Sequence, residues 1–307
     1  MRVTLLHNKS AGSENHAGEE LQASVRRAGH EIVDTVSSTE NLLPSLQAIP
    51  PELVAIAGGD GTVSRAACAL AGSPLPLTVL PLGTANNTAL TLGVRGNVEE
   101  LVQHWSSGHL VPFDVPTLCA GDTTARFSEG VGWGVFPSVM ARTKRMPEPD
   151  EAKRTLERDR RVFQAVIETS EARSYEISVD GLRVAGEFLL VEIMNIPFLG
   201  PQLAVSPESN PSDGLLELVV ATESERPALL ELAATGRMRS GTHLRALRGR
   251  QIEVQTDDTA MHRDGSLVPH ATELVEVSLD VRPASVSYLV ETGARQPTFL
   301  ASSTTSS

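Results

Sequence analysis

The spacing of hydrophobic residues changes along the chain and divides it into two parts. In the first part, apolar runs of strand length alternate with stretches of helical periodicity. Strands separated by helices are typical of a doubly wound α/β domain that is built on a parallel sheet. The predicted strands are 2–6, 30–36, 53–57 and one beginning at 77, and the predicted helices are 14–28, 41–49, 63–71 and 97–108.

The second part begins near residue 116 and consists mainly of short runs in which polar and apolar residues alternate. Asp-Gly pairs at 180–181, 213–214 and 264–265 separate several of these runs, and such pairs favour tight turns between strands. The pattern predicts a β-sandwich that is interrupted by helices at 151–170 and from 226 to 232 or slightly beyond. The predicted strands are 126–131, 175–179, 187–194, 215–221, 251–256 and 274–281.

Two domains and a tail follow from these patterns. We expect an α/β domain over residues 1–116 and a β-sandwich domain over 117–284. Residues 296–307 are rich in serine and threonine, and we expect them to be a disordered tail.

Composition and charge narrow the possible functions. The chain has 307 residues, of which 40% are hydrophobic, and it can bury sizeable cores. Its net charge of −12 argues against a nucleic-acid binder, which would be basic overall or in one domain. Cys68 and Cys119 lie in apolar runs and are expected to be buried free thiols. Because no signal peptide is visible and no apolar run reaches the roughly 20 residues of a membrane span, we expect a cytoplasmic protein.

Two glycine turns carry the candidate chemistry. The first, Gly58-Gly59-Asp60-Gly61-Thr62, joins a buried strand to a helix, and the free N–H groups of a helix start bind anions such as phosphate. An acid in such a turn would repel phosphate unless it holds a cation or takes part in proton transfer. The alternative interpretation is that Asp60 only caps the helix. The second turn, 81–87, follows another strand and contains Gly83, Thr84 and Asn86. Parallel strands would bring both turns to one sheet edge, where α/β sheets bind ligands.

The two turns together resemble the diacylglycerol kinase catalytic-domain family, which includes bacterial lipid kinases, ceramide kinases and sphingosine kinases and is distantly related to the NAD kinases. The resemblance implies an ATP-binding first domain, and it implies that a strand near 285–295 returns to that domain. Asn8 and Thr35 could also be an ordinary turn residue and a strand-end threonine. The implied nucleotide-site residues are Asn8, Lys9, Ser10, Ala11, Gly12, Thr35, Gly58, Gly59, Asp60, Gly61, Thr62, Val63, Ser64, Gly83, Thr84, Asn86 and Arg145.

A second motif, Asn210-Pro211-Ser212-Asp213-Gly214-Leu215, resembles the metal loop of the same family. The resemblance implies a structural Mg²⁺ held by the Asp213 carboxylate and by backbone oxygens of Asn210 and Leu215. A carboxylate and carbonyl oxygens in a tight loop suit a hard cation. The residues alone favour a turn that Asp213 caps.

The catalytic end of the resemblance is incomplete. The family has a late Asp-Gly-Glu turn whose glutamate accepts the proton, whereas this chain has Asp264-Gly265-Ser266. Arg65 also stands where a glutamate commonly follows the first glycine turn. Since a neutral serine is a poor base, Asp264 or Asp60 is the candidate proton acceptor. A plain hairpin turn is the alternative interpretation of residues 264–265.

These observations predict a kinase that transfers phosphate from ATP, with Mg²⁺, to a hydroxyl of diacylglycerol or a related lipid at the inner membrane face. The basic residues around 142–161 would contact phosphates or an anionic membrane, or they form a solvated helix face with ion pairs. Two alternatives remain: a soluble-substrate kinase related to the NAD kinases, and an inactive nucleotide- or lipid-binding regulator, suggested by Ser266 and Arg65. The sequence identifies neither the lipid nor the oligomeric state.

Overall fold

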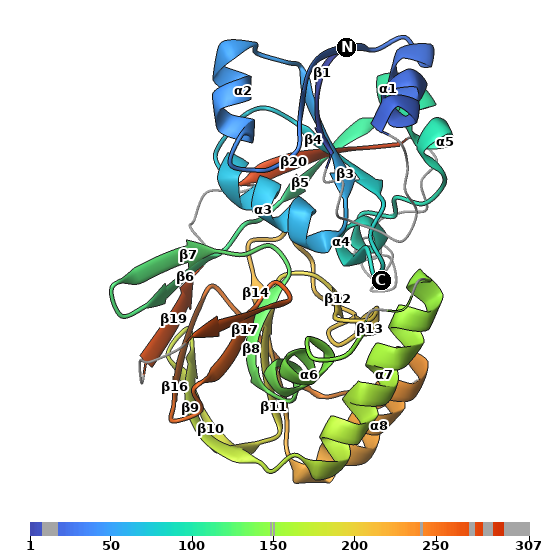
Figure 1. The fold of residues 1–307 in the computed structure, drawn as a ribbon. Helices are drawn as coiled ribbons and strands as arrows, with labels where there is room; N and C mark the ends of the chain where they lie inside the picture. The colour runs from blue at the N-terminus through green and yellow to red at the C-terminus, as the bar shows by residue number, and fades with distance from the viewer. Residues whose placement is uncertain are drawn as a thin grey trace, which may run out of the picture.

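The protein has an α/β part and a β-rich part, stacked one above the other (Figure 1). This computed structural model describes residues 1–7, 18–147, 149, 151–239, 242–269, 274–278 and 285–291. None of the helices within these ranges is long and apolar enough to cross a membrane.

The upper part is built on a sheet in the order β2-β1-β3-β4-β20-β5. Strands β1 to β4 pair in parallel, as the alternation of strands and helices predicts. The late strand β20 returns to this sheet, where it pairs with β4 and, antiparallel, with β5. The strands are β1 (Arg2–His7), β2 (Glu31–Val36), β3 (Leu53–Gly58), β4 (Leu77–Pro81), β5 (His109–Phe113) and β20 (Val286–Val290).

Helices cover both faces of this sheet, with α2 and α3 on one side and α1 and α5 on the other (Figure 1). The helix after the first glycine turn begins at Asp60, three residues before the predicted start, and the short α4 was not predicted. The predicted helix at 97–108 is a shorter α-helix followed by a 3₁₀ turn. The helices are α1 (Gly18–Arg27), α2 (Leu42–Ala48), α3 (Asp60–Leu70), α4 (Asn87–Thr91), α5 (Val98–Gln103) and η1 (Trp105–Ser107).

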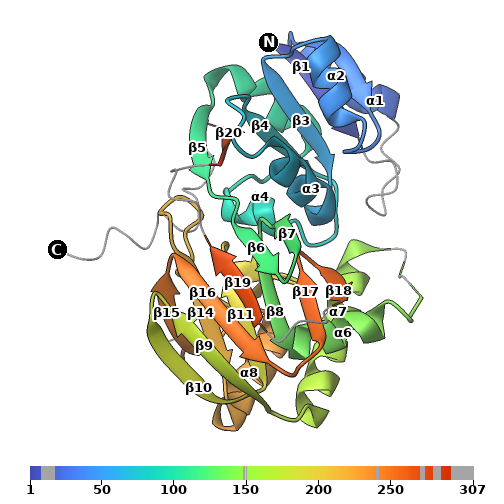
Figure 2. The same ribbon diagram turned by 90° about the vertical axis from the view of Figure 1, so that its left-hand side faces the viewer.

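The lower part is a sandwich of two sheets (Figure 2), whose orders are β10-β9-β16-β19-β6-β7 and β15-β14-β11-β8-β17-β18. Tyr175 and Ile177 of the first sheet pack against Trp133 and Val191 of the second. The first-sheet strands are β6 (Thr117–Ala120), β7 (Thr123–Arg126), β9 (Arg173–Val179), β10 (Leu182–Phe188), β16 (Gln251–Thr256) and β19 (Leu274–Ser278). Those of the second sheet are β8 (Gly130–Gly134), β11 (Leu190–Met194), β14 (Leu216–Ala221), β15 (Arg245–Gly249), β17 (Ala260–Arg263) and β18 (Ser266–Pro269).

Two predicted strands proved wrong because each spans a crossing between the sheets. The predicted strand 126–131 is the end of β7, a connection and the start of β8. Likewise, 187–194 is the end of β10 and all of β11, separated by Leu189. The connecting residues Phe127 and Leu189 are themselves buried, so an apolar residue stands at each crossing. Hydrophobic spacing therefore did not reveal the breaks.

Helices α6 (Val135–Thr143), α7 (Ala152–Thr169) and α8 (Arg226–Thr235) cover the outer face of the second sheet. Phe136, Phe163 and Leu229 of these helices pack with Leu190 and Val219 of the sheet. The predictions for α7 and α8 are confirmed, whereas α6 was missed. Both faces of β11 and β14 are consequently buried. The short β12 (Phe198–Leu199), β13 (Leu203–Ala204) and η2 (Glu223–Glu225) complete the described elements.

A buried hydrogen bond between a glutamate and a histidine fixes β17 against this sheet. Gly132 of β8 lies opposite both Glu192 of β11 and His262 of β17. Because glycine has no side chain, the Glu192 carboxylate reaches across it to Nε2 of His262, at 2.8 Å. A Cβ at Gly132 would lie 2.2 Å from that carboxylate. This contact positions β17, which leads directly into the turn at Asp264.

Candidate active site

The two glycine turns touch each other at one edge of the upper sheet. Strands β3 and β4 are neighbours, and the Leu82 N–H donates to the Gly58 carbonyl over 3.1 Å. A Cβ on Gly83 would lie 2.3 Å from the Cα of Gly59, so only glycine allows this approach. The predicted meeting of the two turns is confirmed, and α3 begins where they meet.

Asn86 closes the second turn. Its side-chain Oδ1 accepts from the Gly83 N–H over 2.9 Å, and its Nδ2 donates to the Gly83 carbonyl over 2.7 Å. Asn86 has a φ of 53°, a left-handed conformation that asparagine tolerates better than most residues. The sequence motif therefore encodes the shape of this turn.

Asp60 caps a helix, but not its own. Its Oδ1 accepts from the Thr88 N–H over 3.2 Å, at the start of α4. Burial raises the pKa of this carboxyl, and backbone N–H groups of residues 86–88 oppose the increase. Asp60 thereby links the start of α3 to the start of α4, which explains why so short a helix forms there.

Glu129 forms a pair of carboxyl groups with Asp60, and the sequence analysis did not predict it. It precedes β8, is almost fully buried, and is hydrogen-bonded to Asp60. Burial, followed by the charges of Asp60 and Asp264, raises the pKa of Glu129 well above its usual range. Two carboxyl groups so close together disfavour the state in which both are ionised. The available signal was a single glutamate in the otherwise small and apolar stretch 127–134.

Asp264 reaches the same place from the lower part of the molecule. Its Oδ1 accepts from the N–H groups of Glu129 and Gly130, at 2.8 and 3.2 Å. Its Oδ2 accepts from the Ser128 N–H at 2.8 Å and from the Ser64 hydroxyl. Burial raises the pKa of this carboxyl, while the four donors favour its ionised form. The Ser64 bond joins α3 to the sandwich.

The predicted hairpin at Asp264 is also confirmed. Arg263 pairs with Ser266, and the two central residues have φ values of 45° and 70°. Both angles lie in the left-handed region that an Asp-Gly pair accepts in a two-residue turn. The hairpin turn and the carboxylate contacts occur together, so the turn geometry is compatible with Asp264 as a proton acceptor.

A cavity of about 390 Å³ (the α3 cavity) lies beside Asp264, between α3 and the β17–β18 turn. Gly61, Ser64 and Arg65 line it from α3, and Ser266 lines it from β18. Ser266 is exposed and also borders a second cavity of about 560 Å³ (the α6 cavity), lined by Met140, Lys144, Met146, Arg158 and Leu267. Ser266, which stands where the resemblance expects a glutamate, therefore lines both cavities.

The other residues predicted for the nucleotide site do not lie together in one place. Residues 8–12, a large part of the predicted set, lie outside the described residues. Thr35 is exposed and lines a separate cavity of about 440 Å³ with His7 and Gly18. Thr62 and Val63 are buried in the first turn of α3, and Thr84 is half-buried in the second glycine turn. Arg145 is exposed after α6 and lines neither the α3 nor the α6 cavity.

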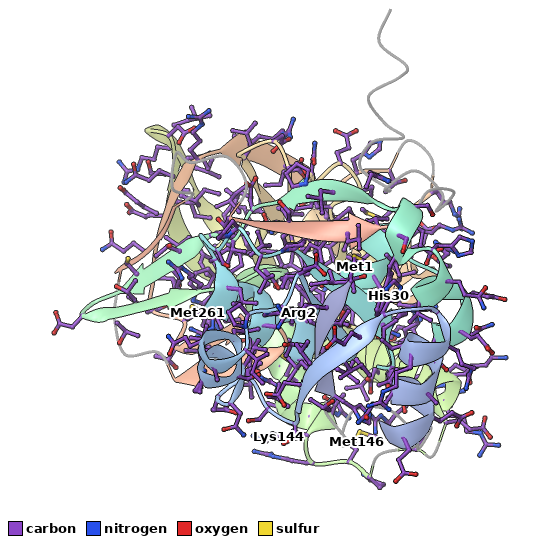
Figure 3. The ribbon with its side chains drawn as sticks, turned by 90° about the horizontal axis from the view of Figure 1, so that it is seen from above. Met1, Arg2, His30, Lys144, Met146 and Met261 are labelled. Atoms are coloured by element: carbon purple, nitrogen blue, oxygen red, sulfur yellow. The ribbon has the colours of Figure 1, made fainter. Side chains whose placement is uncertain are left out.

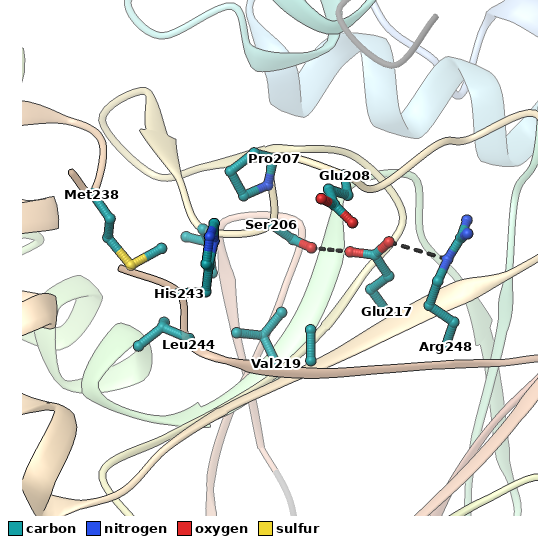
Figure 4. Close-up of a pocket in the computed structure, with 11 residues that line it drawn as sticks. Ser206, Pro207, Glu208, Glu217, Val219, Met238, His243, Leu244 and Arg248 are labelled. Carbon is teal, nitrogen blue, oxygen red and sulfur yellow. Dashed lines mark hydrogen bonds and ion pairs between the residues drawn. The ribbon is translucent and has the colours of Figure 1, made fainter. Parts of the chain in front are cut away.

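The loop with the predicted metal ligands is organised by an arginine. Leu215 donates its N–H to Oδ1 of Asp213 over 3.0 Å, which is an Asx turn, and Arg248 pairs with Oδ2 of the same carboxylate. Strand pairing sets Arg248 opposite Glu217, whose Oε1 lies 3.2 Å from the arginine Nε (Figure 4). Asn210 uses its Oδ1 to accept from the Ser212 N–H.

Since both oxygens of Asp213 have partners, a cation would have to displace the guanidinium, and the loop fits Mg²⁺ poorly as it stands. No group of three or more His, Cys, Asp or Glu side chains in the described part of the chain is arranged to hold a metal.

Ion pairs occupy part of the basic face of α7. Arg154 pairs with Glu151 at 3.6 Å, and Arg158 pairs with Asp159 at 2.7 Å. The interpretation of α7 as a solvated helix face with ion pairs agrees with these contacts. Arg142, Lys144 and Arg145 at the end of α6 are exposed instead.

Comparison with known proteins agrees with this architecture. Residues 2–118 match the model of the diacylglycerol kinase catalytic domain, and residues 151–290 match that of the YegS C-terminal NAD kinase beta sandwich-like domain. A diacylglycerol kinase of Mycobacterium tuberculosis is 25% identical over 304 residues, which cover 91% of this chain and 94% of that protein.

Two solved structures share the fold. A diacylglycerol kinase from Bacillus anthracis superposes with a TM-score of 0.69 at 19% identity, covering 96% of this chain and 98% of that one. An NAD kinase from Archaeoglobus fulgidus in complex with ATP superposes with a TM-score of 0.53 at 13% identity, covering 96% and 95%.

Proposed function

Because the chain belongs to the diacylglycerol kinase catalytic-domain family, we propose that it transfers the terminal phosphoryl group of ATP to a hydroxyl of a lipid. The observation that carries this proposal is the meeting of Asp60, Glu129 and Asp264 at the start of α3, beside the α3 cavity. Family membership supports a phosphotransferase, and the geometry supports the region in which the transfer would occur.

ATP would bind with its phosphates at the start of α3. The first N–H groups of that helix follow the Gly58-Gly59 turn, and such groups bind anionic oxygens. The NAD kinase with the related fold is described in complex with ATP, which supports a nucleotide in this fold. Mg²⁺ would arrive with ATP as part of the substrate and offset charge on the phosphates.

Asp264 is our candidate for the proton acceptor. In the transfer, the lipid oxygen forms a bond to the terminal phosphorus, the bond from that phosphorus to the bridging oxygen breaks, and the hydroxyl proton leaves. Asp264 lines the cavity, and its raised pKa brings it closer to neutral pH, where a base is effective. The Ser64 hydroxyl, bonded to Oδ2, could pass the proton to it.

The lipid would approach through the α6 cavity. Met146 and Leu267 are among the exposed large hydrophobic side chains, and both line that cavity. Lys144 and Met146 project at the edge of the molecule in the view of Figure 3. Apolar side chains beside exposed basic ones suit the peripheral contact with an anionic membrane surface that this function needs.

A transfer assay tests the proposal. Full-length protein is incubated with NAD, Mg²⁺, vesicles that contain extracted lipids, and ATP labelled in its terminal phosphate, and the lipid and water-soluble fractions are counted separately. We expect label in the lipid fraction and its loss in the Asp60→Asn variant. Label in NAD, or ATP binding without any labelled product, would instead favour the soluble-substrate kinase or the inactive regulator.

A further inference from the structure

Three arginines from distant parts of the sequence line the α3 cavity. Arg65 lies on α3, Arg126 on β7 and Arg263 on β17. The β6–β7 hairpin lies next to α3 in Figures 1 and 2, and Arg126 donates from Nη1 to the Cys68 carbonyl over 3.3 Å. The fold thus brings three guanidinium groups to one concave surface.

The three arginines that line the cavity outnumber its two acids, Glu40 and Asp264. None of the three forms an ion pair with any residue that the structure describes. Hydrogen bonds from its own N–H group and from Ser38, and then the charge of Arg65, lower the pKa of Glu40. Asp264 has its oxygens bonded to Ser64 and backbone N–H groups. Cys68 adds no negative charge, because burial raises the pKa of its thiol to about 12. A basic cavity in a chain of net charge −12 suits an anionic ligand.

The cavity extends away from the region proposed for the ATP phosphates. Its lining residues on α3 are 61, 64, 65, 68 and 69, which form one stripe along the side of the helix. The eight steps from residue 61 to residue 69 make the stripe about 12 Å long at 1.5 Å per residue. Arg126 lies near Cys68, toward the far end of that stripe, whereas the phosphate site lies at the helix start. The cavity can therefore hold a second anionic group.

We propose that this second group is the phosphate of the acceptor lipid, so that the preferred acceptor is an anionic phospholipid whose headgroup carries a free hydroxyl. This proposal rests on the proposed lipid kinase function and narrows its substrate class. Guanidinium groups bind phosphate oxygens through paired, charge-assisted hydrogen bonds. Arg126 and Arg263, whose charges both act on the Cys68 thiol, would hold the headgroup phosphate, and Arg65, beside Gly61, would lie between it and the ATP phosphate. The reaction is the phosphoryl transfer written above, with the headgroup hydroxyl as the nucleophile.

Kinetics with two acceptors test the proposal. Phosphatidylcholine vesicles contain either dioleoylglycerol or phosphatidylinositol at the same mole fraction, and labelled lipid is measured. We expect kcat/KM to be at least tenfold higher for phosphatidylinositol. Arg126→Gln should raise the KM for phosphatidylinositol about tenfold and the KM for ATP less than twofold.

The matched control is Arg183→Gln, which removes an exposed arginine of β10 that does not line the cavity. It changes the net charge equally, so general attraction to the vesicle would affect both variants alike. A preference for dioleoylglycerol, equal effects of the two variants, or an effect of Arg126→Gln on the KM for ATP alone would overturn the proposal.

A binding measurement separates this proposal from the kinase function. Calorimetry with the water-soluble headgroup glycerophosphoinositol, without ATP, should detect binding to the wild type and at least tenfold weaker binding to Arg126→Gln. Binding of this kind without lipid phosphorylation would end the proposed kinase function while retaining the anion site. Lipid phosphorylation without headgroup binding would end the anion site while retaining the kinase function.

Discussion

Replacing Asp264 by asparagine tests whether this residue accepts a proton or only holds the two parts of the molecule together. The carboxylate accepts hydrogen bonds from three backbone N–H groups and from the Ser64 hydroxyl. Asparagine keeps the shape and one oxygen, which can serve Glu129 and Gly130. Its NH₂ group then faces the Ser128 N–H, and a donor meets a donor. The side chain also loses its ability to take up a proton.

The cost in stability follows from that single mismatch. An unsatisfied buried donor destabilises a protein by about 1–3 kcal/mol. Loss of the charge itself costs little, because the raised pKa shows that burial already disfavours the ionised form. At roughly 2–4 °C per kcal/mol for a domain of this size, Tm should fall by about 2–12 °C. The fold should persist, whereas loss of a general base lowers the rate by about 10²–10⁴-fold.

Asp180→Asn is the matched control for this variant. Asp180 begins the other Asp-Gly hairpin turn, with a φ of 48°, and its carboxylate likewise accepts from backbone N–H groups, those of Arg250 and Gln251. It lies at the exposed end of the sandwich. The control variant should keep kcat within twofold of wild type while showing a comparable or smaller change in Tm.

The assay combines thermal melting with the pH dependence of lipid phosphorylation. For the wild type, kcat/KM should rise with pH until Asp264 is ionised, and Asp264→Asn should lack this rise. A variant with a rate within threefold of wild type would refute the role of Asp264 and leave Asp60 as the next candidate. Equal losses of activity in the Asp264 and Asp180 variants would indicate a structural effect instead.

Three further predictions concern other parts of the site. Gly83→Ala should lower stability by about 1–3 kcal/mol and raise the KM for ATP, because the new Cβ would meet the Gly59 backbone. Thermal melting and kinetics measure both effects, and an unchanged Tm would contradict the contact. Burial raises the pKa of Glu129, so the folded state retains a proton that the unfolded state has lost, and wild-type stability should fall as pH rises from the ordinary value of 4.5 toward the raised one. Denaturant titrations across this range should give a shallower fall for Glu129→Gln, and an identical slope would refute the assignment. Because Arg248 already pairs with Asp213, chelation of Mg²⁺ should change Tm by less than about 1 °C. Arg248→Met, in contrast, should lower Tm. A fall of several degrees in Tm on chelation would establish a bound Mg²⁺ in this loop.

The sequence by itself determined the local elements with unambiguous spacing. The strand at 53–57, the helix α7 and the hairpins at Asp180 and Asp264 all formed as predicted. Each depends on the conformations available to a few adjacent residues, such as an Asp-Gly pair that accepts positive φ, or on one period of hydrophobic residues. The resemblance carried by the glycine turns also identified the family, because those turns are short and contiguous.

Only the tertiary structure decided which residues share the site. Ser64 and Asp264 are 200 residues apart and bond across the boundary between the two parts. Asp60 caps α4 rather than α3, Glu129 lies buried against it, and Arg248 pairs with the carboxylate expected to hold a metal. Hydrophobic spacing records whether a side chain is buried but not which partner it meets. The partner depends on how sheets pack and how strands pair in register, and those long-range contacts form only in the folded chain.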